Sequence, residues 1–148
     1  MKIVIKSFLK AAALAEIKID PKKIEIRSLG CPHIPKTLPA GKMGIYIFHH
    51  KNKCLKIGKA GVKSNARFSS QHYASGRAKS NLAKSLLLDT KMNQGLSENG
   101  IGAWIRENTT RTDILLDESL GVWTLNFLEA FLHCRYRPIY EGYKGQVQ

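Results

Sequence analysis

The stretch that decides the fold is GIYIFHHKNKCLKIGKAG, residues 44–61. Two short runs rich in β-branched and apolar residues flank the polar turn HHKNK. This pattern predicts two antiparallel strands joined by a hairpin. Tyr46 and Lys56 interrupt the apolar runs, and a glycine lies two residues from each. The hairpin therefore carries a phenol and an ammonium at positions where apolar side chains are expected.

The apolar pattern of the hairpin also predicts its register. Four residues are expected to share the buried face, namely Ile45, Ile47, Leu55 and Ile57. Ile45 is then opposite Ile57 and Ile47 opposite Leu55, or the pairing is shifted by two residues. In either register Tyr46 and Lys56 lie together on the other face, which we expect to be exposed. The nearby glycines leave room there for a ligand.

The remaining elements predict an α+β domain with a small three-stranded antiparallel sheet flanked by helices. We expect helices over residues 63–74, 80–89, 103–109 and 119–137, and a third strand over 111–117. Pro138 ends the last and clearest helix. Upstream of the hairpin, residues 2–15 could form a helix and 23–29 a short strand. Trp104, Trp123 and Phe127 are expected in the core.

The chain divides into three parts. Residues 1–40 form an N-terminal extension that either contacts DNA or packs on the core. The extension ends in a proline-rich connector, residues 31–41. Residues 41–138 form the domain that contains the hairpin. Residues 139–148 form a C-terminal tail that we expect to be loose.

The charge of the chain predicts a polyanionic partner. The 148 residues carry a formal charge of +13, and no Asp or Glu occurs between residues 26 and 88. That window contains twelve lysines and arginines. Such a field attracts nucleic acid, whose phosphates release counterions when they are neutralised. The alternative is a basic protein whose charge only keeps it soluble.

The cysteines indicate a reduced, cytoplasmic chain. There are three, scattered and without a CxxC pair, which does not suit a disulfide framework. A zinc site can be drawn from Cys31, His33, His49, His50 and Cys54, but its spacing matches no common ligand pattern. Lys6 and Lys10 interrupt the apolar N-terminus, which therefore fails as a signal peptide. No run of residues is long enough to predict a membrane span.

Four features of the chain, taken in order, resemble the GIY-YIG nuclease family. Residues 44–46 (GIY) match its first motif, and residues 56–58 (KIG) match its second, nine residues later, with lysine where the family usually has tyrosine. Arg67 matches the arginine of the next helix and Glu129 the glutamate of a later helix. The resemblance covers about residues 43–137. Certain restriction-type members also have lysine at the second tyrosine position, so this departure looks like a mark of that subgroup.

The resemblance implies a metal-dependent DNA endonuclease, site-specific and restriction-like. Tyr46 would be the general base, and Glu129 would hold one divalent cation, Mg2+ or Mn2+. Arg67 would stabilise the negative charge that builds on the phosphate. A free phenol has a pKa of about 10. A positive charge at Lys56 would favour the phenolate, which gives a physical reason for a lysine there.

The chain departs from the family pattern at two positions. The family often has histidine or tyrosine four residues after the arginine, where this chain has Gln71. His72 and Tyr73 follow directly and are candidates for phosphate contact or for protonation of the leaving group. Many members also have an asparagine beyond the glutamate, and none follows Asn126 here.

The partner is expected to be DNA. The basic residues expected to contact its backbone, rather than to read bases, are Lys59, Lys63, Arg77, Lys79 and Lys84. Cutting both strands of a duplex would favour a homodimer or a higher homo-oligomer. Two alternatives stay open: a non-catalytic nucleic-acid-binding domain that kept the nuclease fold, and a basic RNA-binding protein.

Overall fold

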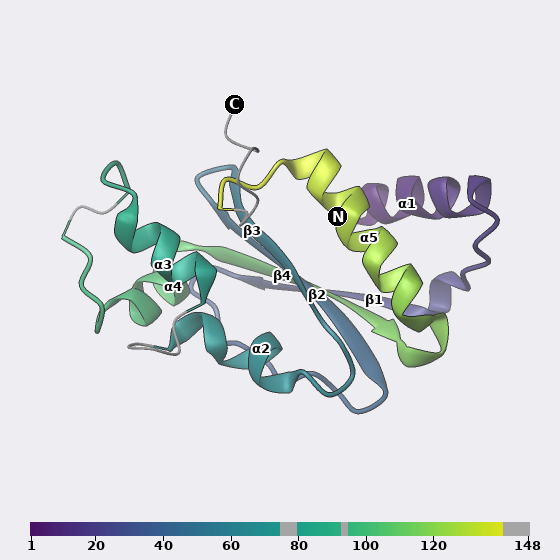
Figure 1. Ribbon diagram of the computed structural model, residues 1–148, viewed down its shortest axis with the longest axis horizontal. Coiled ribbons are helices and arrows are strands. Elements are labelled where there is room, and N and C mark those ends of the chain that lie inside the picture. Colours follow the sequence, from purple (N-terminus) through teal and green to yellow (C-terminus); the bar gives the residue numbers. More distant parts are fainter. Residues whose placement is uncertain (75–79, 93–94, 141–148) are drawn as a thin grey trace.

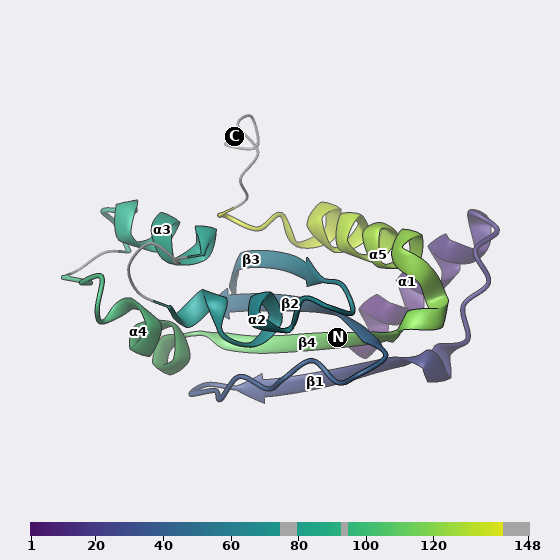
Figure 2. The same cartoon turned by 60° about the horizontal axis from the view of Figure 1, so that its bottom comes forward.

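The computed structural model describes residues 1–74, 80–92 and 95–140, which form an α+β fold around one antiparallel sheet (Figures 1 and 2). The sheet has four strands, β1 (Ile24–Gly30), β2 (Lys42–His50), β3 (Lys53–Ala60) and β4 (Thr110–Asp117). Their order is β1-β4-β2-β3, so β3 lies at an edge. The α+β class is confirmed. The expected count of three strands is wrong, because β1 pairs with β4 from Ile24 opposite Leu116 to Gly30 opposite Arg111.

Helices cover both faces of the sheet. They are α1 (Lys2–Leu14), α2 (Asn65–Ser69), α3 (Asn81–Leu88), α4 (Ile101–Asn108) and α5 (Gly121–Tyr136), with 3-10 turns η1 (Pro21–Lys23), η2 (Gln71–Tyr73) and η4 (Glu118–Leu120). The apolar residues of α1 and α5 join one buried cluster, and those of α2, α3 and α4 join the other. The helix expected over 63–74 is broken at Ser70 into α2 and η2. Among the described helices, none is long and apolar enough to cross a membrane.

The hairpin has the register that is shifted by two residues. Ile47 lies opposite Ile57 and Tyr46 opposite Gly58. A bulge between Phe48 and His49 breaks the alternation on β3. Leu55 therefore packs with Tyr46 in one cluster while Ile57 packs in the other, so the expectation that Leu55 shares the face of Ile57 is wrong.

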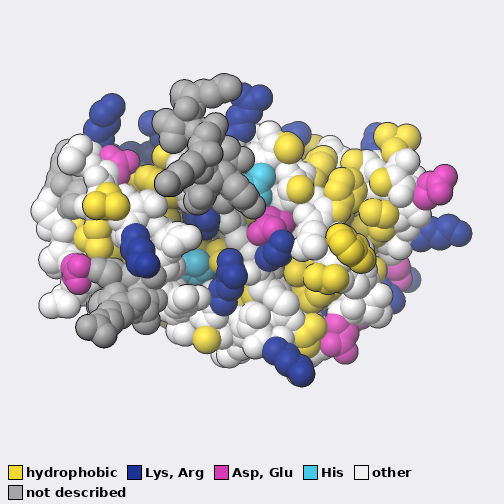
Figure 3. Space-filling view, viewed as in Figure 1, with side chains coloured by type: hydrophobic (Ala, Val, Ile, Leu, Met, Phe, Trp, Pro, Cys, Tyr) yellow, Lys and Arg dark blue, Asp and Glu magenta, His cyan; other side chains and the backbone are white. Residues whose placement is uncertain are grey.

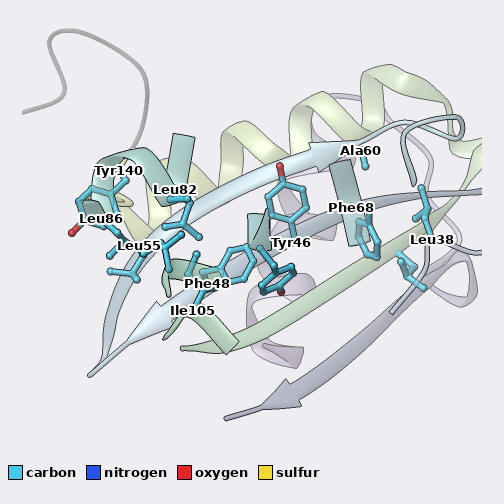
Figure 4. Close-up of a cluster of buried hydrophobic side chains, with 14 residues drawn as sticks. Leu38, Tyr46, Phe48, Leu55, Ala60, Phe68, Leu82, Leu86, Ile105 and Tyr140 are labelled. Atoms are coloured by element: carbon cyan, nitrogen blue, oxygen red, sulfur yellow. The ribbon is translucent and has the colours of Figure 1, made fainter. Parts of the chain in front are cut away.

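The face that carries Tyr46 is buried, whereas we expected it to be exposed. Tyr46 is 1% exposed and Phe48 is fully buried, because α2, α3 and α4 pack over them. A sheet covered on both faces has no wet side, and alternation of polar and apolar residues then says little about exposure. Figure 4 shows the Tyr46 ring within this cluster, directed towards β3.

Residues 1–30 belong to the same packed unit as the rest of the described chain. The Phe8 ring of α1 lies 5.4 Å from the Phe127 ring of α5, and β1 adds a strand to the sheet. Of the two alternatives for the N-terminal extension, the structure has the one in which it packs on the core. Contact of this extension with DNA stays a prediction.

Three aromatic residues expected in the core have different environments. Trp104 is partly buried against the cluster that contains Tyr46, and Phe127 is partly buried against the other cluster. Trp123 is 81% exposed, so its expected burial is wrong. Its position in the first turn of α5 points it away from the sheet, which Leu125 and Leu128 face.

The first two residues of the expected C-terminal tail are ordered by backbone bonds to β3. The amide of Ile139 donates to the Cys54 carbonyl at 3.0 Å, and that of Tyr140 to the Leu55 carbonyl at 2.9 Å. The Tyr140 hydroxyl also donates to Asp89 Oδ2 at 2.7 Å. The expectation of a loose tail is therefore wrong for these two residues, and residues 141–148 lie outside the described part.

Candidate active site

The Tyr46 side chain occupies space that only a glycine at position 58 leaves open. In the β2–β3 register Gly58 is the direct partner of Tyr46. A Cβ at Gly58 would lie 2.6 Å from Cε2 of the Tyr46 ring and would also overlap its hydroxyl. The glycine of the KIG motif therefore has a steric reason here, because it lets the phenol cross the edge strand.

Arg67 is the cation that meets the Tyr46 hydroxyl. Its Nε donates to the hydroxyl oxygen at 3.4 Å. Helix α2 is fixed at this place by Phe68, which is fully buried and packs over Gly44. Burial raises the pKa of Tyr46, and the hydrogen bond and charge of Arg67 act in the opposite direction. The same bond raises the pKa of Arg67.

Glu129 approaches this pair from the opposite face of the sheet. It projects from α5 and forms an ion pair with Lys59 of β3, with 2.6 Å between Nζ and Oε2. The charge of Glu129 acts on both Tyr46 and Arg67, raising the pKa of each. Its side chain is 20% exposed, so water and ligands can reach it. Figure 3 shows an acidic side chain among several Lys and Arg side chains near the middle of the molecular surface in view.

Lys56 shares the Tyr46 face, as expected, but it lies opposite Phe48 rather than opposite Tyr46. Its positive charge acts on His72, where it lowers the pKa. The hydrogen bond to the phenol comes from Arg67 instead. A role for Lys56 in favouring the phenolate stays a prediction.

His72 lies directly against the Tyr46 ring. The two ring centroids are 4.4 Å apart in an edge-on arrangement, and a second aromatic contact joins His72 to Phe48 at 5.2 Å. His72 is buried, and neither ring nitrogen has a hydrogen-bond partner among the described residues. Burial, with the nearby charges of Arg111, Lys56 and Arg67, lowers the pKa of His72 to about 3. The imidazole is therefore neutral at physiological pH.

Tyr73 does not join the group around Tyr46. Its hydroxyl is bonded to His33 Nε2 at 2.8 Å and accepts from Arg111 Nη1 at 3.0 Å. Burial raises the pKa of this hydroxyl. The other ring nitrogen of His33 contacts the Thr109 carbonyl at 2.8 Å. Tyr73 therefore links the N-terminal segment to β4, and its expected role at the phosphate has no geometric support.

A buried ion pair that was not predicted from the sequence lies behind the site. Arg111 and Asp113 of β4 are 0% and 1% exposed, and Arg111 Nε donates to Asp113 Oδ1 at 2.7 Å. Arg111 also donates from Nη2 to the Phe68 carbonyl at 2.6 Å. Asp113 lies opposite Tyr46 in the sheet, and Arg111 stacks 5.6 Å from the Tyr46 ring centroid. This pair therefore connects β4 to the helix that carries Arg67.

The buried pair also contains an unsatisfied hydrogen-bond acceptor. Asp113 Oδ2 is buried without a hydrogen-bond partner among the described residues. Burial accordingly raises the pKa of Asp113, although Arg111 opposes this effect. Polar residues two apart on a strand were the only sequence feature that could have revealed the pair, because they place both side chains on one face.

The basic residues expected to bind DNA have mixed outcomes. Lys63 and Lys84 are exposed, while Lys59 is half-buried and paired with Glu129. Arg77 and Lys79 lie outside the described residues. Contact of these residues with DNA stays a prediction.

No group of three or more His, Cys, Asp or Glu side chains is arranged to hold a metal within residues 1–74, 80–92 and 95–140. The zinc site drawn from the sequence is not assembled: both ring nitrogens of His33 already contact Tyr73 and Thr109. A divalent cation could use Glu129 as a single protein ligand. Comparison of the chain with protein-family models, curated proteins and solved structures found no match.

Proposed function

We propose that the protein is a metal-dependent DNA endonuclease, site-specific and restriction-like, with its active site at Tyr46, Arg67 and Glu129. One observation carries the proposal. These three residues come from segments far apart in the sequence, yet Arg67 bonds to the Tyr46 hydroxyl and the charge of Glu129 acts on both. A phenol, a guanidinium and a carboxylate at one edge of a basic protein suit phosphodiester hydrolysis.

Tyr46 acts as the general base that accepts a proton from the attacking water. Its raised pKa keeps it protonated at neutral pH, so the active fraction grows as the pH increases. Arg67 opposes this effect of burial, because it donates to the oxygen that becomes the phenolate. The remaining N–H groups of Arg67 bind the non-bridging phosphate oxygens in the transition state.

Glu129 is the residue that would hold a divalent cation. A carboxylate oxygen is the ligand that Mg2+ and Mn2+ prefer, and the partial exposure of Glu129 leaves room for water and phosphate oxygens to complete the shell. When bound, the ion would neutralise charge on the phosphate and favour ionisation of the attacking water. Lys59 balances the charge of Glu129 and lies where it can contact the same phosphate.

The alternative is a nucleic-acid-binding domain that kept this fold without the chemistry. The charge of +13 suits both functions. The contact between Arg67 and the Tyr46 hydroxyl favours the nuclease, because backbone binding alone requires no group bonded to a buried phenol.

Cleavage of supercoiled plasmid, with Mg2+ or with EDTA, tests the proposal. The wild-type protein is expected to give discrete fragments only with the metal. Glu129→Gln and Tyr46→Phe should lose cleavage by about 100-fold or more. Both variants should keep DNA binding in EDTA, measured by fluorescence anisotropy. Glu107→Gln, an exposed carboxylate on α4, is the matched control and should cut like the wild type.

Each other outcome has a definite meaning. A smear of fragments would support nuclease activity and refute site specificity. Cleavage by Glu129→Gln at the wild-type rate would refute the metal assignment. Salt-sensitive binding without cleavage, for any metal, would favour the non-catalytic alternative.

A further inference from the structure

An exposed tryptophan lies on the helix that carries the proposed metal ligand. Trp123 is 81% exposed and its neighbour Val122 is 55% exposed. Leu125, Leu128 and Leu132 of the same helix face the sheet and are buried. At 100° per residue, Trp123 then lies on the ridge of α5 that faces away from the sheet. Its indole has no role in the buried clusters.

Trp123 lies close to the proposed metal ligand along the axis of α5 but on a different side of the helix. It precedes Glu129 by six residues, which is about 9 Å along the helix and about 120° around its axis. That length corresponds to between two and three nucleotides at about 3.4 Å each along a DNA strand. Figure 3 shows hydrophobic side chains over α5 beside the basic cluster on the same face of the molecule.

Basic side chains contact the chain before and after Trp123, one in η4 just ahead of α5 and one on α5 itself. Lys23 donates to the Ser119 hydroxyl at 2.8 Å, four residues before Trp123. Lys59 pairs with Glu129, six residues after it. An exposed aromatic ring between two such lysine contacts suits a single strand of nucleic acid, whose bases can stack on the ring while its phosphates meet the cations.

We propose that Trp123 stacks on a nucleobase of the bound DNA, within about three nucleotides of the cleaved bond. The proposal rests on the proposed function for the position of that bond, and on charge for the choice of partner. A protein with a charge of +13 repels a second copy and attracts a polyanion. Every base has a π face, so this contact adds affinity with little sequence preference.

Tryptophan fluorescence tests the contact without cleavage. The chain has two tryptophans, so Trp104→Phe leaves Trp123 as the single indole. Titration with an oligonucleotide in EDTA should quench its emission and protect it from acrylamide. The partly buried Trp104, observed alone in Trp123→Phe, should change little. Trp123→Ala should weaken DNA binding by about 5- to 150-fold with an unchanged salt slope. Leu14→Ala, an exposed apolar residue on α1, is the matched control and should bind like the wild type.

The outcomes separate this inference from the proposed function. If DNA binds by anisotropy while Trp123 emission and acrylamide access stay unchanged, the stacking contact is refuted and the nuclease stands. Quenching by DNA in a protein that never cuts plasmid refutes the nuclease and supports the contact. Quenching that depends on protein concentration without DNA, with dimers in sedimentation, assigns Trp123 to a second copy and overturns the proposal.

Discussion

Replacement of Arg111 by Met is expected to remove much of the stability of the domain. The substitution leaves the Asp113 carboxylate, 1% exposed, without its cation. Breaking a buried ion pair from one side costs about 3–5 kcal/mol. The Phe68 carbonyl also loses the donor at 2.6 Å, which adds about 1 kcal/mol. The expected loss of about 4–6 kcal/mol compares with a total of about 5–15 kcal/mol for a domain.

Urea denaturation followed by circular dichroism measures this loss, and a double variant tests its cause. Adding Asp113→Val to Arg111→Met removes the unpaired charge, so the double variant should regain about 2–4 kcal/mol over the single one. Arg135→Met, on the exposed end of α5, is the control and should change stability by less than about 0.5 kcal/mol. The reasoning is refuted if Arg111→Met costs less than about 1 kcal/mol, or if the double variant loses the sum of the two single losses.

Two further predictions concern the surroundings of Tyr46. Gly58→Ala places a methyl group 2.5 Å from Cζ of the Tyr46 ring, so it should cost about 1–3 kcal/mol in a thermal melt and strongly reduce plasmid cleavage; Gly61→Ala, with nothing within 4 Å, should change neither. If both variants behave alike, the steric role of Gly58 is wrong. His72 has a pKa of about 3 when folded and near 6.5 when unfolded, so acid favours the unfolded chain from about pH 6.5 downwards. Between pH 8 and pH 5 the wild type should therefore lose about 2 kcal/mol more unfolding free energy than His72→Phe, and equal losses would contradict the neutral, buried imidazole.

The hairpin could be predicted from the sequence because its strands alternate cleanly over most of their length. The alternation of side chains along each strand put Tyr46 and Lys56 on one face, and the structure confirms this. The alternation could not reveal the bulge after Phe48, because the bulge depends on how the turn closes. This bulge places Leu55 on the other face. A short strand was also expected at β1, over residues 23–29. Its pairing in the sheet could not be predicted, because its partner β4 lies more than 80 residues away in sequence.

The buried charges and the exposed indole could not be predicted, for related reasons. Arg111 and Asp113 resemble the solvent-exposed face of a strand until α2 and η2 are known to pack over that face of the sheet. Trp123 resembles a core residue because a large apolar side chain is usually buried. Exposure of each depends on tertiary neighbours rather than on local pattern.

The bonds from Ile139 and Tyr140 to β3 bear on how copies of this protein avoid joining one another. A strand at the edge of a sheet offers its carbonyls as a template on which another chain can extend the sheet. The two backbone bonds occupy the Cys54 and Leu55 carbonyls with the chain's own residues. At the other end of the same strand, Gly58 and Lys59 lie beside the proposed site, where a charged side chain hinders such pairing. The two halves of β3 are thus blocked from pairing with another chain by different means. The backbone of residues 139–140 covers one half, and the charges proposed to bind DNA lie at the other.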